Sequence, residues 1–275
     1  MADEKLRVYW HDDCMLHDGG PSVLENEPPD YILFPEPHVE SAMRVRNIKG
    51  ILETGPLKNL IDLRNGRHAT DEEILTFHTQ GHLDAMKAAA ANPDPVRIDG
   101  GGTVVNDGTL EASTAAAGTT LDALNAVLNE PGGPVYSLVR PPGHHAQPTM
   151  GDGNCIFNNV AIAVEAARAQ GIERVAVIDW DVHHGNGTQT GFFERDDVLT
   201  ISIHMNHGSW GPNHPEAGLA DEIGSGAGVG FNRNVPLPFG VGNSCYEAVL
   251  TDLVTPLIAD FKPGLIIVAA GEDAN

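Results

Sequence analysis

Hydrophobic residues along this chain gather in short continuous runs that alternate with longer stretches of helical spacing. The short runs are bounded by Gly, Pro or charged residues, which is typical of buried strands. We expect strands at Arg7 to Trp10, Val135 to Val139, Arg174 to Ile178, Val198 to Ile203 and Leu265 to Ala270. Strands that alternate with helical segments favour an α/β fold with a mainly parallel central sheet and helices on both faces.

Three longer segments carry apolar residues at the three-and-four spacing of a helix with one buried face. They cover Gly108 to Leu128, Phe157 to Ala169 and Ser244 to Phe261. Pro256 falls inside the last of these, and because proline lacks the backbone N–H and clashes with the preceding turn, we expect it to kink this helix.

Composition narrows the class of protein. The 275 residues, 41% of them hydrophobic, suffice for one large core, so we expect a single domain over residues 1–275. The start of the chain has no signal-like apolar stretch, and no run of about 18 apolar residues occurs, which favours a soluble cytoplasmic protein without membrane contact. The 3 cysteines are widely separated and include no CxxC pair, so neither a disulfide framework nor a thiolate zinc site is indicated.

The chain is strongly acidic. Its 38 acidic and 16 basic residues give a formal net charge of -22. Such a charge repels phosphate backbones, so direct binding to nucleic acid is not expected. The acidity can steer cationic substrates to a cleft, or it can serve only solubility or a salt-rich habitat, and charge alone leaves these alternatives open.

One apolar strand ends in a cluster of acidic residues and histidines, VAVIDWDVHHGNGT from Val175. Alternate residues of an extended chain face the same way, so Asp179, Asp181 and His183 project together at the carboxyl end of a parallel strand, where α/β sheets place ligand sites. Carboxylates and an imidazole suit zinc, and a catalytic site needs three protein ligands. Asp273, after the apolar strand GLIIVAAG, can be the third. We therefore predict a metal site of Asp181, His183 and Asp273.

A second motif, RPPGHHA at Arg140 to Ala146, delivers two adjacent histidines. Two prolines and a glycine fix this loop, which places His144 and His145 next to each other. Neighbouring imidazoles near a metal can divide acid and base work. The surrounding stretch, Arg140 to Asn154, and the later stretch His204 to Gly224 are rich in Gly, Pro and His, so we expect both to be long loops.

Four motifs, in matching order and spacing, resemble those of histone deacetylases and bacterial histone deacetylase-like amidohydrolases: RPPGHHA, GDGNCIFNNVAIA, DWDVHHGNGTQ and AAGEDA. HVESAMRV from His38 resembles the family's early stretch, and RPPGHHA together with Asn186 resembles the class II version. The resemblance implies an arginase- and deacetylase-like fold. It also implies a zinc-dependent deacetylase, a hydrolase of linear amide C–N bonds that removes acetyl or other acyl groups from N-acyl lysine in proteins or peptides.

The resemblance further implies roles for single residues. It implies one catalytic zinc ion on Asp181, His183 and Asp273. It also implies that His145 takes a proton from water and later protonates the leaving amine, while His144 contributes mainly electrostatics. By the same resemblance, Asp179 pairs with His144 and Asn186 pairs with His145.

Less specific parts of the resemblance concern a second cation and the substrate. A structural potassium ion is implied at Asp179, Asp181, His183, Ser202 and Ile203. Substrate contacts are implied at Asp99, Gly153, Asn154 and Trp210. Asn154 stands where the family has an aromatic residue, so one wall of the implied substrate tunnel becomes small and polar.

Several alternatives stay open at this stage. An acetylpolyamine amidohydrolase would use the same chemistry, with an acetylated polyamine in place of an acetylated lysine protein or peptide as the partner. A catalytically impaired acyl-lysine or metal-binding module is an alternative of another class. An arginase-like manganese hydrolase would need a two-metal ligand set, and only one complete triad is visible. Formation of a homo-oligomer is left open.

The resemblance also bears on the end of the chain. Family members continue beyond the position of Asn275 into a Gly-Gly-Tyr segment, whose Tyr or His donates to the developing oxyanion. No such segment occurs in this sequence. We therefore expect a deacetylase-like domain that lacks its C-terminal portion, and losing one oxyanion donor costs about 100-fold to 1000-fold in rate.

Overall fold

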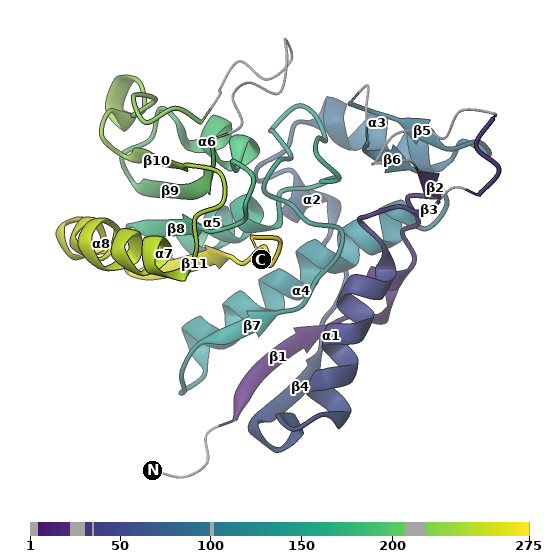
Figure 1. The fold of residues 1–275 in the computed structure, drawn as a ribbon, viewed down its shortest axis with the longest axis horizontal. Coiled ribbons are helices and arrows are strands. Elements are labelled where there is room, and N and C mark those ends of the chain that lie inside the picture. The colour runs from purple at the N-terminus through teal and green to yellow at the C-terminus, as the bar shows by residue number, and fades with distance from the viewer. Residues whose placement is uncertain (1–4, 23–30, 35, 100–101, 207–217, 275) are drawn as a thin grey trace. The chain divides into compact units, whose positions relative to one another are not determined.

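A computed structural model describes residues 5–22, 31–34, 36–99, 102–206 and 218–274 of the chain. It divides the chain into two compact units, unit 1 at residues 1–163 and unit 2 at residues 164–275. Each unit combines parallel strands with helices (Figure 1), so the α/β class predicted from the sequence is confirmed. The single domain over residues 1–275 stays a prediction.

The main sheet of unit 1 is parallel and has the strand order β4-β1-β7. β1 (Leu6–Trp10) pairs with β4 (Ile61–Asn65) on one side and with β7 (Val135–Ser137) on the other. β1 and β7 lie where the sequence predicts strands. β4 was not predicted, because it is a strand at the end of the sheet whose sequence, IDLRN, has no buried residue and so lacks a continuous apolar run.

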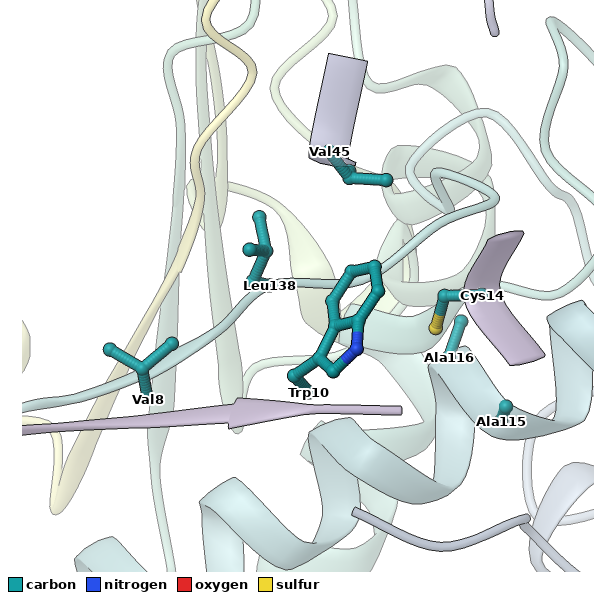
Figure 2. Packing of buried hydrophobic residues seen from close by; sticks show 7 residues of the cluster. All are labelled: Val8, Trp10, Cys14, Val45, Ala115, Ala116 and Leu138. Carbon is teal, nitrogen blue, oxygen red and sulfur yellow. The ribbon is translucent and has the colours of Figure 1, made fainter. Parts of the chain in front are cut away.

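The core of unit 1 forms around β1 and two helices, α1 (Ala42–Thr54) and α4 (Thr109–Asn129). Val8 and Trp10 of β1 pack with Val45 of α1 and with residues of α4 (Figure 2). The intervening Tyr9 contacts a separate cluster on α4. The strand is therefore buried through both faces, as its continuous apolar sequence predicts, and α4 occupies the predicted helical segment within one residue at each end.

Shorter elements complete unit 1. Helix α2 begins with a capping box, in which Thr70 and Glu73 each bond the other's backbone N–H. Two antiparallel pairs, β2 with β3 and β5 with β6, flank the main elements. The remaining elements of this unit are β2 (Pro21–Ser22), β3 (Glu36–Pro37), α2 (Asp71–Ile74), α3 (Gln80–Ala90), β5 (Val96–Arg97), β6 (Val104–Val105) and the 3-10 turns Asp12–Met15 and Lys58–Leu60.

The sheet of unit 2 is also parallel and has the order β10-β9-β8-β11. The three predicted strands of this unit are present, and β10 was not predicted because its sequence, NRNVPL, is largely polar. α5 was predicted as a helix and runs across the boundary between the units. The elements are α5 (Asn159–Ala169), β8 (Val175–Asp179), α6 (Asn186–Phe192), β9 (Val198–Met205), the 3-10 turn Gly226–Gly228, β10 (Asn232–Leu237) and β11 (Leu265–Ala269).

The helical segment around Pro256 is continuous but irregular. α7 (Asn243–Val249) passes through a π turn (Leu250–Val254) into α8 (Thr255–Phe261). The Thr255 backbone N–H donates to Leu250 O, five residues earlier, one turn before the proline. The disturbance expected from Pro256 therefore takes the form of a π turn. In the part of the chain that the structure describes, no helix has both the length and the apolar character needed to cross a membrane.

Candidate functional site

At the carboxyl end of β8, two aspartate carboxylates each accept a hydrogen bond from the backbone N–H two residues later. Asp179 is the last residue of the strand and is buried. Its Oδ1 accepts a hydrogen bond from Asp181 N at 3.1 Å, and Asp181 Oδ1 in turn accepts one from His183 N at 2.8 Å. Each carboxylate thus fixes the backbone two residues further on, and this local bonding turns the side chains of Asp181 and His183 out of the end of the sheet.

Asp273 reaches the same place from the neighbouring strand. β11 runs parallel to β8 with Ala269 opposite Asp179, so the chain after β11 emerges at the edge where Asp181 emerges. Asp273 Oδ1 accepts a hydrogen bond from Val182 N at 3.0 Å. This bond, across 91 residues of sequence, holds the distant carboxylate against the turn that follows β8.

The three predicted metal ligands converge in unit 2. His183 Nδ1 lies 3.0 Å from Asp181 Oδ1 and 3.0 Å from Asp273 Oδ2. One ligand atom from each of the three residues lies within 4.8 Å of the others. The hydrogen bond that the His183 ring donates to Asp181, and then the one to Asp273, raise the pKa of His183 to about 10, although burial opposes this. Two carboxylates around one imidazole nitrogen form a place for positive charge, and this donor set fits a divalent metal such as zinc.

Gly271 makes this convergence sterically possible. A Cβ atom placed on Gly271 would lie 1.9 Å from Asp181 Oδ2 and 2.5 Å from its Cγ. No side chain larger than hydrogen fits beside the Asp181 carboxylate at that distance. The sequence motif AAGEDA therefore carries a positional requirement for glycine, which the sequence analysis did not identify.

Several residues with polar side chains contribute to the lining of a small cavity in unit 2. Its wall includes Asp179 and Ser202, which are opposite each other in the β8–β9 register, and the side chains of Gln189, Asn232 and Asn234. Gln189 Oε1 accepts hydrogen bonds from both asparagine amides, at 2.9 Å and 2.7 Å. This network of Gln189, Asn232 and Asn234 was not predicted, because its members come from two elements, α6 and β10, that are distant in sequence.

Two further predicted residues, Asn186 and Ile203, directly follow the cavity residues Gly185 and Ser202 in the chain. Asn186 is the first residue of α6 and is buried, and Ile203 of β9 is part of the apolar core of unit 2. Ser202 Oγ lies 2.8 Å from His204 Nδ1. The structure therefore gives Ser202 a polar environment and Ile203 an apolar side-chain environment.

The adjacent histidines belong to unit 1 and lie on the predicted loop. The ring centroids of His144 and His145 are 4.0 Å apart with the rings inclined at 45°, and both side chains are buried. Gly153 approaches His145 so closely that a Cβ at residue 153 would lie 2.3 Å from His145 Cδ2. The position of each ring is thus restricted by its neighbours. The pairings of His144 with Asp179 and of His145 with Asn186 join residues of different units and stay predictions.

A buried ion pair anchors the start of this loop. Arg140 Nε donates to Glu40 Oε1 at 2.8 Å, and its terminal nitrogens donate to His17 O at 2.6 Å and to Glu40 O at 3.1 Å. Both side chains are almost completely buried. Further along the loop, Asn158 Nδ2 donates to Ala146 O at 3.1 Å. The histidine loop is therefore held from both ends by polar contacts with the rest of unit 1.

Three of the four predicted substrate contacts are described. Asp99 accepts hydrogen bonds from Thr103 N at 3.2 Å and 3.1 Å, and Thr103 Oγ1 accepts one from Asn154 N at 2.7 Å. Thr103, which was not predicted, thus connects Asp99 to Asn154, the chain neighbour of Gly153. Asn154 has a φ of 66°, a left-handed conformation that asparagine tolerates better than most residues. Trp210 lies outside the described residues.

Parallel α/β sheets and an Asp2His cluster at the carboxyl edge of one of them define a class of α/β proteins with a candidate cation site at that edge. Comparison with known families narrows this class: residues 38–275 match the histone deacetylase domain model. The chain belongs to the histone deacetylase family, which makes it a deacetylase-like amidohydrolase, a hydrolase. The family predicted from the sequence motifs is confirmed.

Individual relatives agree with this assignment. The chain is 43% identical over 277 residues to Histone deacetylase 8 of Arabidopsis thaliana, covering 100% of this chain and 73% of that protein. It is 40% identical to a histone deacetylase-like amidohydrolase of Pseudomonas aeruginosa, covering 95% of this chain and 68% of the relative. The crystal structure of the HDA15 HD domain superposes with a TM-score of 0.85 at 32% identity, covering 100% of this chain and 73% of that one.

Proposed function

We propose that this chain is a zinc-dependent deacetylase that removes acetyl or other acyl groups from N-acyl lysine side chains of proteins or peptides. The observation that carries the proposal is the convergence of Asp181, His183 and Asp273 at the carboxyl ends of β8 and β11. Three ligands of this kind suit a catalytic zinc ion and leave a coordination position open. Zinc bound there would acidify water and polarise the acyl carbonyl.

We propose that His145 moves the proton during the reaction. One ring nitrogen accepts a proton from water as the oxygen attacks the acyl carbon, and the same nitrogen gives it to the leaving nitrogen as the C–N bond breaks, so that acetate and a free amine result. His144, in ring contact with His145, contributes mainly electrostatics. Burial of both rings supports these roles because it limits competition from solvent water. Asp179 and Asn186 are the proposed partners of His144 and His145.

A structural potassium ion is proposed beside Asp179, Asp181 and His183, with Ser202 and Ile203. The small cavity with Asp179 and Ser202 in its wall supports this part of the proposal. At the substrate side, Asp99, Gly153 and Asn154 are proposed to contact the acylated chain. Their support is the Thr103 bridge, which links this group to the loop of His145.

Acetate release from an acetyl-lysine peptide tests the proposed function. The purified chain is freed of metal with a chelator and reloaded with zinc, and an N-acetylated polyamine is assayed in parallel. We expect zinc to restore hydrolysis of the peptide, and we expect Asp181→Asn to abolish that hydrolysis. Asp252→Asn, an exposed acidic position in the same unit, is the matched control and should keep full activity. Hydrolysis that persists without metal, or survives Asp181→Asn, contradicts the proposal.

Two other outcomes of the same assay favour the alternatives. Hydrolysis of the polyamine with negligible turnover of the peptide identifies an acetylpolyamine amidohydrolase with the same chemistry. Binding of zinc without hydrolysis of either substrate identifies an acyl-lysine or metal-binding module. The polar Asn154 in its left-handed conformation is the observation that favours the module over the enzyme.

A further inference from the structure

A second cluster of metal-ligating side chains lies in unit 1, outside the residues assigned to the proposed active site. One ligand atom from each of His11, Asp13 and His68 lies within 4.8 Å of the others. His68 Nε2 is 2.8 Å from Asp13 Oδ2, and His11 Nδ1 is 3.8 Å from the same oxygen. The two imidazole rings are in edge-to-face contact, with centroids 4.7 Å apart. We propose that these residues form a second binding site for a divalent transition metal.

The hydrogen bonds of His68 support a cation at this position. Its Nδ1 lies 2.8 Å from Thr114 Oγ1, and that hydroxyl lies 3.0 Å from Leu110 O. Because a hydroxyl has one proton, a Thr114 that donates to Leu110 O accepts from His68 Nδ1–H. In the neutral ring, Nε2 then carries a lone pair directed at the Asp13 carboxylate. Two acceptors at 2.8 Å require a positive particle between them, either a proton or a metal ion.

His11 is the side chain that a metal ion would engage and a shared proton would not; it now caps the 3-10 turn Asp12–Met15. A proton shared between His68 and Asp13 makes no use of His11, whereas a metal ion uses all three side chains. His11 Nδ1 now accepts a hydrogen bond from Asp13 N at 3.2 Å, and coordination would replace this long bond. The contact between His68 Nδ1 and Thr114 is of the kind that orients metal-ligating histidines through the nitrogen that does not bind the metal.

The cluster lies at the carboxyl ends of two parallel strands, where α/β sheets commonly bind ligands. His11 follows β1 directly, and His68 follows the parallel neighbour β4, so both emerge at the carboxyl edge of this sheet. Gly66 N donates to Trp10 O at 2.8 Å, which joins the two chain segments just before the ligands. A Cβ on Gly118 of α4 would lie 2.4 Å from His68 C, so the helix packs tightly against the segment that carries this ligand.

The donor set defines the class of ligand. Two imidazoles and one carboxylate suit zinc and the neighbouring divalent transition metals, and they do not suit Ca²⁺ or Mg²⁺, which prefer oxygen ligands. The side chains are 23%, 37% and 40% exposed, so the site is accessible and water can complete the coordination. The guanidinium of the adjacent Arg67 is neutralised by ion pairs with Glu73 and Asp122 and does not oppose a bound cation strongly.

Zinc stoichiometry after dialysis tests this proposal with Zn²⁺ as the probe. The Asp181→Ala/His183→Ala variant removes the other candidate site, and we expect it to retain about one zinc ion per chain. Adding His68→Gln to this variant should abolish the retained zinc. Asp12→Asn is the matched control, because Asp12 neighbours the cluster but bonds Trp10 Nε1, and it should leave the retained zinc unchanged.

The outcomes of this test do not depend on the proposed function. Loss of all zinc from the Asp181→Ala/His183→Ala variant, with native far-UV circular dichroism, overturns the second site. Zinc that is retained but unaffected by His68→Gln also overturns it, because the metal then binds elsewhere. Melting temperature supplies an independent measurement: zinc should raise it in the Asp181→Ala/His183→Ala variant and in the variant that also carries Asp12→Asn, but not in the variant that also carries His68→Gln.

Discussion

Glu40 and Arg140 form an ion pair at 2.8 Å, and the side chains are only 5% and 1% exposed. The pair joins the segment before α1 to the loop that carries His144 and His145, across 100 residues of sequence. Removing one member of such a pair leaves a buried charge without its partner. The interaction therefore matters for the stability of unit 1 and for the position of the histidine loop.

We predict that Glu40→Leu lowers the free energy of unfolding by about 3–5 kcal/mol, because Arg140 then stays buried and unpaired. Urea unfolding followed by circular dichroism measures this loss. Glu53→Leu is the control: Glu53 pairs with Lys49 near the surface, and its loss should cost less than about 1 kcal/mol. Equal effects of the two substitutions would show that burial of the Glu40–Arg140 pair has no energetic consequence.

His145→Ala should separate catalysis from metal binding. His145 is not among the proposed metal ligands, so we expect the variant to retain zinc while its deacetylation rate falls by about 100-fold to 10,000-fold. Zinc content by elemental analysis and acetate release from an acetyl-lysine peptide are measured on the same samples. A parallel loss of zinc and activity would contradict the role assigned to His145.

Gly271→Ala should disturb the proposed zinc site through the Asp181 carboxylate. The added methyl group would lie 1.9 Å from Asp181 Oδ2, so the carboxylate has to move. We expect zinc affinity to fall by at least about 10-fold, as it does when the groups supporting a metal ligand are changed. Gly242→Ala is the matched control, since a Cβ there has no heavy atom within 4 Å. Identical zinc titrations of the two variants would refute the steric argument.

Buried histidines should make unit 1 sensitive to acid. Burial, reinforced by Arg140, lowers the pKa of His17 from 6.5 to about 3, and burial, reinforced by His82, lowers that of His78 to about 3. The unfolded chain therefore binds protons between pH 6.5 and 3 that the folded chain does not bind. Above pH 6.5 these two histidines take no free energy of unfolding away. As the pH falls from 6.5 towards 3, the free energy of unfolding decreases by about 1.4 kcal/mol per pH unit for each histidine.

Nuclear magnetic resonance and denaturant unfolding check this prediction together. The ring signals of His17 and His78 should stay those of neutral imidazole down to about pH 4, while the urea midpoint moves to lower concentration as the pH falls from 6.5. Ring signals that titrate near pH 6.5 in the folded protein would remove the cause assigned to the loss of stability.

The fold and the ligand cluster were predictable to the extent that they depend on local pattern. The alternation of side chains along β8 and the parallel direction of β11 were enough to predict that Asp181, His183 and Asp273 lie close together. β4 and β10 were missed because their sequences lack the apolar runs by which buried strands are recognised.

The parts of the site that were missed depend on partners distant in sequence. Thr103 meets Asn154 across 51 residues, and Glu40 meets Arg140 across 100. Neither pair has a periodicity or spacing from which the contact follows. Gly271 was visible in a motif, but the reason for a glycine lies in its approach to a carboxylate from another strand, which only the folded chain shows.

The backbone amides of Val182 and His183 hold both carboxylates of the cluster. Val182 N donates to Asp273 Oδ1 and His183 N donates to Asp181 Oδ1. An ionised carboxylate has about four lone-pair sites, so each keeps sites for a cation after it has accepted its amide hydrogen bond. Because both amides belong to the turn that follows β8, a shift of that turn would displace both carboxylates. Two peptide groups of one turn thus position oxygen atoms that come from two strands.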